Sequence, residues 1–139
     1  MLKCDKLSIT IAGRTLVREL SLELGSGEVI CMLGPNGVGK TLALHTLAGL
    51  LTPASGVVML DGEDISELGR RQIARRLWLL LQDDAESFPA TVLDTVLMGR
   101  HPYMPALGSA SAADHALADQ ALAAMDLGGF SPRTVGTLS

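Results

Sequence analysis

Residues 34–41 constrain this chain more than any other stretch. They read Gly-Pro-Asn-Gly-Val-Gly-Lys-Thr and fit the pattern G-x-x-x-x-G-K-[ST] of a phosphate-binding loop. The apolar run 29–33 before them predicts a buried strand, and the helix-forming residues 41–48 follow, with Gly49 as a stop. Because such a loop must connect a strand to a helix, the context supports the motif.

Each part of the loop has a predicted role toward the phosphates of a nucleotide. Glycines let the backbone bend so that successive N–H groups point inward, and the N-terminus of the next helix adds partial positive charge. Lys40 supplies a full charge to the β- and γ-phosphates, and the Thr41 hydroxyl is placed to ligate Mg²⁺. The alternative is a glycine-rich turn that binds nothing. The predicted binding residues are Gly34, Pro35, Asn36, Gly37, Val38, Gly39, Lys40, Thr41 and Leu42.

Composition limits the remaining possibilities. The chain has 139 residues, enough for about one domain, and 47% apolar but only 3% aromatic residues, so the expected core is aliphatic. The net charge of -4 and the lack of a long basic cluster argue against nucleic acid as a partner. Cys4 and Cys31 lack metal-ligand spacing, and Cys31 is expected in the core. No apolar run is long enough to span a membrane.

Residues 1–89 are predicted to form an α/β core. Asp64 and Glu67 have capping-box spacing and predict a helix through about Arg75. Trp78 is expected in the core, inside an apolar run typical of a strand covered on both faces. The predicted strands are residues 2–11, 20–24, 29–33, 57–60 and 77–81.

Residues 90–139 are predicted to form a helical subdomain. Thr91 with Asp94 is a capping signature that opens a helix through about Gly99, and Ser111 with Asp114 opens a longer one that ends at residues 128–129. On the second helix, an apolar stripe is expected at Leu117, Ala121, Ala124 and Met125.

Several short motifs occur together in one known family. They are Gly-Pro-Asn-Gly at 34–37, Ser55-Gly56 leading to Leu60-Asp61-Gly62, Gln82 after a strand, and Leu138-Ser139. With these motifs the chain resembles, over essentially its whole length, the nucleotide-binding subunit of ABC transporters. Residues 99–102, Gly-Arg-His-Pro, are most similar to the branch that serves importers of iron–siderophore, haem and cobalamin.

The resemblance implies a P-loop NTPase fold, with an N-terminal antiparallel β part and a helical subdomain. It implies an ATPase that binds ATP and Mg²⁺ and works as a head-to-tail pair on the cytoplasmic face of the bacterial cell membrane, docked on permease subunits that a substrate-binding protein supplies. Gln82 resembles the glutamine that reaches Mg²⁺ and the attacking water. Ser139 resembles the signature serine that touches the γ-phosphate held by a partner subunit. The acidic residues Asp83, Asp84 and Glu86 are expected to be a solvated loop.

The chain also departs from the family pattern. The resemblance implies that the Walker B aspartate, the catalytic glutamate and the switch histidine lie beyond Ser139, so residues 1–139 are predicted to bind Mg–ATP weakly without turnover. The family commonly has an aromatic residue near Ile11 to stack on adenine, whereas Arg14 or Val17 is the candidate contact here. Leu42 replaces a hydroxyl-bearing residue. A non-hydrolysing nucleotide-binding module and a soluble ABC-type ATPase without a transport role are the alternatives.

Overall fold

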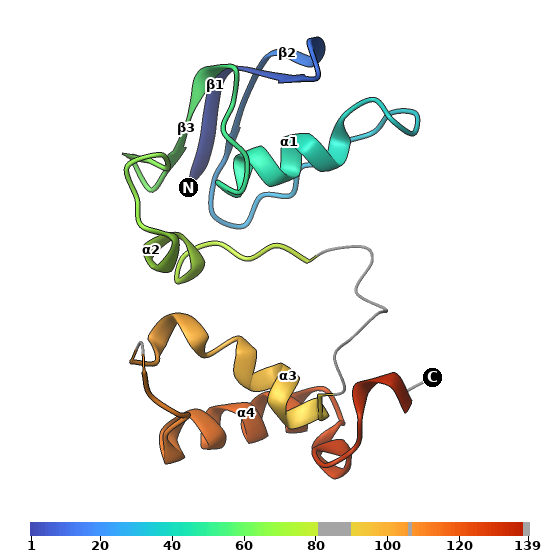
Figure 1. Cartoon of the computed structure of the whole chain (residues 1–139), viewed down its shortest axis with the longest axis vertical. Helices are drawn as coiled ribbons and strands as arrows, with labels where there is room; N and C mark the ends of the chain where they lie inside the picture. The colour runs from blue at the N-terminus through green and yellow to red at the C-terminus, as the bar shows by residue number, and fades with distance from the viewer. Residues whose placement is uncertain (81–89, 106, 138–139) are drawn as a thin grey trace. The chain divides into compact units, whose positions relative to one another are not determined.

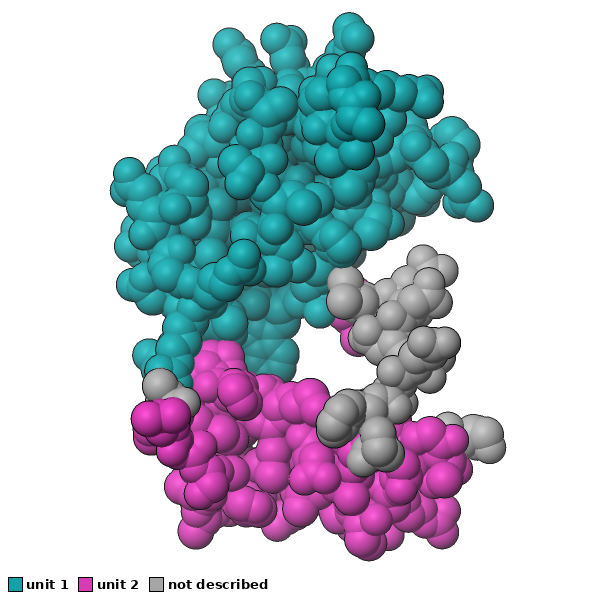
Figure 2. Space-filling view, viewed as in Figure 1, with its two compact units in different colours: residues 1–79 teal, residues 80–139 magenta. Residues whose placement is uncertain are grey.

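The computed structural model describes residues 1–80, 90–105 and 107–137. These residues form two compact units, 1–79 and 80–139 (Figure 2). The first unit carries a sheet and helices and the second is helical, which is the α/β architecture expected from the sequence. Gln82, Ser139 and the acidic residues that follow Gln82 lie outside the described residues.

A four-stranded antiparallel sheet is the frame of the first unit. Its strand order is β2-β1-β3-β4, formed by β1 (Leu2–Ile11), β2 (Arg14–Leu24), β3 (Ser55–Leu60) and β4 (Glu63–Asp64). Ala12 and Gly13 both have positive φ, 48° and 77°, as a tight two-residue hairpin turn requires. The structure confirms the strands that the sequence predicts at residues 2–11, 20–24 and 57–60.

The core of this unit is aliphatic, as predicted. Helix α1 (Lys40–Leu47) lies beside the sheet in Figure 1 and adds Ala43 and Leu47 to the buried residues of the strands. Ile65 and Ile73 close the cluster from the segment after β3. The buried members from the sheet are Cys4, Leu7, Ile9, Val58 and Leu60. Leu7 has no exposed surface at all, so β1 is the central strand of the packing.

Two predicted strands do not form. Residues 29–33 and 77–80 have no regular secondary structure, and Val29 is 94% exposed, Cys31 is exposed and Trp78 is 74% exposed. The core positions expected for Cys31 and Trp78 were therefore wrong. A strand exists only when a neighbour pairs with its backbone, and within the described residues neither segment has one. Residue 81 lies outside the described residues.

The helix expected to start at Asp64 begins later. Helix α2 (Arg70–Ala74) has Gly69 before its first residue, and the Gly69 N–H donates to the side chain of Gln72 at 2.8 Å. The Asp64 carboxylate instead accepts hydrogen bonds from the backbone and hydroxyl of Ser66, at 2.9 and 2.7 Å. The acidic residue thus makes a local turn in place of a helix cap, a competing use of the same side chain.

The second unit contains two capped helices that pack on each other. Helix α3 (Val92–Met98) follows Thr91, and α4 (Ala112–Ala124) follows Ser111; in each the hydroxyl accepts from the backbone N–H of an aspartate three residues on. Both predicted capping signatures are confirmed, although α4 ends at Ala124, before residues 128–129. Short 3-10 turns complete the unit: η1 (His101–Tyr103), η2 (Gly128–Phe130) and η3 (Val135–Thr137).

The buried face of α4 is offset by one position from the predicted stripe. Asp114, Ala118 and Leu122 are buried, whereas Leu117 is 45% and Met125 is 72% exposed. The face is set by the aspartate: its carboxylate accepts from the Ser111 hydroxyl at 2.6 Å and from Arg100 Nε at 2.9 Å. The Arg100 guanidinium also lies over the Tyr103 ring, 4.3 Å from its centroid. A polar group in the interface thus decides which apolar residues turn inward.

Candidate phosphate-binding site

The loop 34–41 runs into the N-terminus of α1, as the motif predicts (Figure 1). Gly37 and Gly39 adopt left-handed backbone conformations, with φ of 79° and 107°. A side chain at either position would strain the backbone, since L-residues rarely adopt this region. The glycines of the motif are therefore required by the observed bend of the chain.

The N-terminus of α1 has free hydrogen-bond donors. Gly39 precedes the helix without a side-chain cap, and no acidic residue occupies the first turn. Among the described residues, the backbone N–H groups of Gly37, Lys40 and Thr41 have no hydrogen-bond acceptor. Unpaired donors and the positive end of a helix dipole together favour an anion.

Lys40 brings a full positive charge to the same loop. Its Nζ donates to the carbonyl oxygens of Gly34 at 2.7 Å and Pro35 at 2.9 Å. Both acceptors are neutral, and no carboxylate pairs with this ammonium group among the residues that the structure describes. The charge is held in place over the loop and is not neutralised, so the residues present fit a bound polyphosphate.

Fewer side chains are candidates for binding a divalent cation than for binding phosphate. The Thr41 side chain is exposed beside the free donors. The described part of the chain contains no group of three or more His, Cys, Asp or Glu that could hold a metal ion. Mg²⁺ usually has only one or two protein ligands, and phosphate oxygens and water complete its octahedral coordination. A single hydroxyl is therefore a sufficient protein ligand when a nucleotide is bound.

One contact of the phosphate loop, with strand β2, was not predicted from the sequence. A Cβ built on Gly39 would lie 3.3 Å from Val17 Cγ2 and 3.4 Å from Leu16 Cβ. Val17 was a candidate for contact with the base, and Leu16 was missed. Strand β2 is separated from the loop along the chain, and no motif marks this approach, so only the packing of the first unit reveals it.

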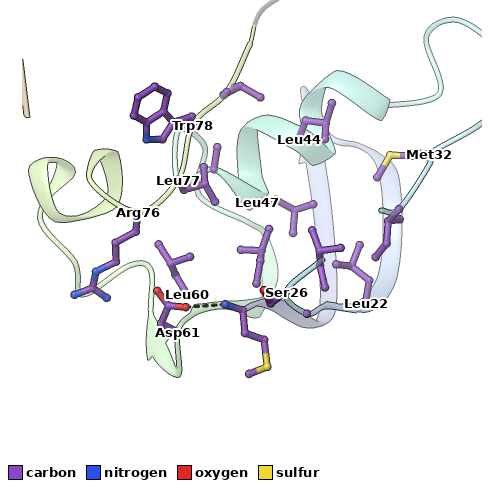
Figure 3. A pocket seen from close by; sticks show the side chains of 17 residues that line it. Leu22, Ser26, Met32, Leu44, Leu47, Leu60, Asp61, Arg76, Leu77 and Trp78 are labelled. Atoms are coloured by element: carbon purple, nitrogen blue, oxygen red, sulfur yellow. Dashed lines mark hydrogen bonds and ion pairs between the residues drawn. The ribbon is translucent and has the colours of Figure 1, made fainter. Parts of the chain in front are cut away.

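An apolar groove of about 520 Å³ lies elsewhere on the first unit (Figure 3). None of its lining residues belongs to the loop 34–41. Ile30, Met32 and residues 77–79 line part of this groove. They belong to the two segments that were predicted as strands but have no regular secondary structure. The other walls come from Leu22, Leu44, Leu47 and Leu60. The groove is thus an uncovered part of the core, and it is distinct from the anion-binding end of α1.

Comparison with known proteins identifies a family and several relatives of this chain. The sequence pattern described as ABC transporter matches residues 17–139. The chain is 38% identical to the hemin import ATP-binding protein HmuV of Rhizobium meliloti (strain 1021), over 100% of this chain and 52% of that protein. It is 33% identical to the ferric enterobactin transport ATP-binding protein FepC of Escherichia coli (strain K12), over 99% of this chain and 51% of that protein. The chain thus spans about half the length of these relatives.

A solved structure shows the same fold at lower sequence identity. It is the dimeric post-hydrolysis state of the ATP-binding cassette MJ0796 bound to ADP and Pi. The match has a TM-score of 0.78 and 21% identity, and it covers 100% of this chain and 63% of that one. None of the helices in the described ranges has the length and hydropathy needed to cross a bilayer.

Proposed function

This chain belongs to the ABC transporter family, and on that premise we propose that it is the nucleotide-binding part of an importer ATPase subunit. The observation that carries the proposal is the N-terminus of α1, where unpaired backbone donors and the Lys40 ammonium group meet. The likeness of the loop to its motif alone would leave open a turn that binds nothing. Free donors beside an unneutralised cation favour a bound anion.

The roles of the loop residues follow from their chemistry. The N–H groups of Gly37, Lys40 and Thr41 donate to phosphate oxygens, and the Lys40 ammonium group exchanges its two carbonyl partners for the β- and γ-phosphates. Thr41 supplies a hydroxyl to Mg²⁺, which neutralises phosphate charge when bound. We assign Leu42 only an apolar contact at the α-phosphate, so the nucleotide is held less tightly than it is by a loop with a hydroxyl there.

We propose further roles for the two residues outside the described part. Gln82 reaches Mg²⁺ and the attacking water, and Ser139 meets the γ-phosphate held by a partner subunit. Hydrolysis also needs a residue that acts as a base toward this water, and we assign that role to no residue of 1–139. The proposed activity of the 139-residue chain is therefore binding of Mg–ATP without turnover, and hydrolysis belongs to the whole protein.

The proposed setting is a membrane importer. Two ATPase subunits pair head to tail on the cytoplasmic face of the membrane, and residues 90–139 with the Gln82 segment dock on a permease fed by a substrate-binding protein. The proposed cargo is an iron chelate, haem or cobalamin. Relatives named for hemin and for ferric enterobactin match almost equally well, at 38% and 33% identity, so identity alone does not choose between cargoes.

Equilibrium binding of Mg–ATP to the purified chain tests the proposal. We expect Lys40→Met to weaken binding at least about tenfold, since a charge-assisted hydrogen bond contributes about 1.5–3 kcal/mol. Lys3→Met is the matched control: Lys3 lies on β1 and pairs with Glu23 at 3.0 Å, and its loss removes the same charge away from the loop. Equal affinities of the two variants would contradict the site. ATP hydrolysis by this chain that Lys40→Met abolishes would contradict the absence of turnover.

A further inference from the structure

Helix α2 and the two residues after it carry the densest group of positive charges in the chain. Of the 11 Lys and Arg residues, four lie within this short stretch: Arg70, Arg71, Arg75 and Arg76. No Asp or Glu occurs in the sequence between Glu67 and Asp83, although the net charge of the whole chain is -4. Positive charge is therefore concentrated in one segment of an acidic chain.

The fold turns these basic side chains away from the core. Ile73 is the buried residue of α2, and all four arginines are exposed. Arg71 and Arg75 are four positions apart, so they are neighbours on the helix surface, on the side opposite Ile73. Like charges at this spacing repel each other, which lowers helix stability. We call this surface the arginine face; it consists of Arg70, Arg71 and Arg75.

Only part of the positive charge is neutralised within the first unit. Arg76 forms an ion pair with Glu63, with 2.5 Å between Nη1 and Oε1. No carboxylate of the described residues forms an ion pair with Arg70 or Arg71. These two guanidinium groups therefore offer positive charge to an anionic partner.

The position of the arginine face favours an extended anionic partner over a small anion. Small ligands bind in concave sites where polar groups converge. None of the three residues of the arginine face lines the apolar groove, which Arg76 borders at its edge (Figure 3). Guanidinium groups side by side on a helix surface suit many anionic groups without a fixed spacing, as lipid headgroups are.

Exposed apolar residues directly follow the arginine face. Residues 77–79 are Leu-Trp-Leu, and Trp78 is 74% exposed. Tryptophan is enriched where a membrane meets water, and arginine buries its aliphatic stem there while its charged end contacts headgroups. A nucleic acid duplex offers a row of phosphates but no apolar layer for Trp78. The combination therefore favours a bilayer.

We propose that the arginine face, together with Trp78, binds the surface of an anionic bilayer. The guanidinium groups contact headgroup phosphates, and the indole ring lies at the boundary between headgroups and acyl chains. None of these residues belongs to the loop 34–41, so the lipid contact is independent of the proposed nucleotide site. In the proposed importer, the chain contacts lipid directly, in addition to its protein partners.

Partition of the full 139-residue chain into vesicles tests the proposal. Vesicles of phosphatidylglycerol and phosphatidylcholine in equal parts are compared with vesicles of phosphatidylcholine alone, by flotation at low and at raised salt. We expect binding to the anionic vesicles that raised salt weakens, and little binding to the neutral vesicles. Equal binding to both kinds of vesicle overturns the proposal, because the exposed apolar surface then suffices. Binding to neither kind overturns it as well.

Matched variants locate the contact. Arg70→Gln with Arg71→Gln should lower partition into anionic vesicles about tenfold or more, since each basic residue near such a surface contributes about fivefold. Lys6→Gln with Arg18→Gln is the control, because it removes the same charge from exposed positions of β1 and β2. Arg70→Lys with Arg71→Lys keeps the charge and should bind as the parent chain does. Equal losses in the two glutamine variants, or an equal loss in the lysine variant, overturn the proposal.

Two competitors distinguish the bilayer from other anions. Inorganic phosphate and a short DNA duplex are added at the phosphate concentration of the lipid, and we expect neither to release the chain from anionic vesicles. Release by inorganic phosphate indicates a small-anion site, and release by DNA indicates a nucleic-acid surface; either result overturns the proposal. Mg–ATP affinity is measured on the same samples. A chain that binds Mg–ATP but no vesicles contradicts the lipid contact alone and leaves the proposed function intact.

Discussion

Gly56 and Gly62 have the same left-handed backbone conformation but different surroundings. Both have φ of 86°. A Cβ at Gly56 would lie 2.6 Å from the carbonyl oxygen of Asp5 and as close to the backbone of Lys6, whereas a Cβ at Gly62 would meet nothing within 4 Å. The pairing of β1 with β3 shifts register at this point, between Asp5 and Ser8. Gly56 therefore lets β3 approach the irregular part of β1.

This difference predicts unequal costs for the same substitution. Gly56→Ala and Gly62→Ala share the backbone strain, about 1 kcal/mol. Only Gly56→Ala adds a clash with backbone atoms that cannot rotate away, so we expect it to lower the free energy of unfolding by about 3 kcal/mol or more. Urea unfolding followed by circular dichroism measures both variants. If the two variants lose the same amount of unfolding free energy, the prediction is wrong, and β1 moves to make room for the methyl group of Gly56→Ala.

At the scale of single elements, α4 depends on one carboxylate for its start and its orientation. The Ser111 hydroxyl and the Arg100 side chain donate hydrogen bonds that lower the pKa of Asp114 from 3.8 to about 2. Because the pKa is lower in the folded state than in the unfolded state, the ionised carboxylate stabilises the fold above about pH 4. That contribution is lost as the pH falls from about 4 to about 2.

The pH dependence can be measured on the helical signal. We expect far-UV circular dichroism to show loss of helix in the parent chain between about pH 4 and pH 2. We expect the Asp114→Asn variant to have less helix than the parent at neutral pH and to lose less helix on acidification. Asp119→Asn is the control, since Asp119 is exposed on the same helix and has no hydrogen-bond partner among the described residues. An acid transition that is the same in Asp114→Asn as in the parent chain would rule out this carboxylate as its cause.

At the scale of the whole molecule, large apolar side chains remain uncovered on the first unit. Val29, Leu33 and Trp78 are 94%, 86% and 74% exposed, and all three lie in or beside segments that the sequence predicts as strands. The groove between those segments has walls of core-type side chains. Exposed apolar surface of this kind marks an interaction site or a site of aggregation.

We therefore expect the isolated chain to self-associate as its concentration rises. The double variant Val29→Gln and Trp78→Gln should shift sedimentation profiles toward the monomer, because it removes two of the most exposed apolar side chains of the unit. Thr52→Gln with Ala54→Gln, at exposed positions of a loop, should leave the profile unchanged. A chain that stays monomeric at every concentration, with Trp78 fluorescence shielded from iodide, would contradict the exposed surface.

The sequence by itself determined the features that depend on neighbouring residues. The phosphate-loop motif and the caps at Thr91 and Ser111 are local, and the structure has the caps and the loop at the start of α1 where the sequence predicted them. Local hydrogen bonds and backbone preferences suffice to specify such features. The pairing of β1 with β2 belongs here too, because a hairpin pairs strands that are close in sequence, whereas β3 pairs with β1 from a distant part of the chain.

Only the tertiary structure decided which apolar segments are covered. An apolar run such as 29–33 or 77–81 predicts a buried strand, yet burial and pairing depend on a neighbouring strand from elsewhere in the fold. The side of α4 that faces inward was likewise set by the pairing of Asp114 with Arg100, fourteen positions away. The approach of Leu16 and Val17 to the phosphate loop has the same origin, since contacts between distant segments leave no periodic trace in the sequence.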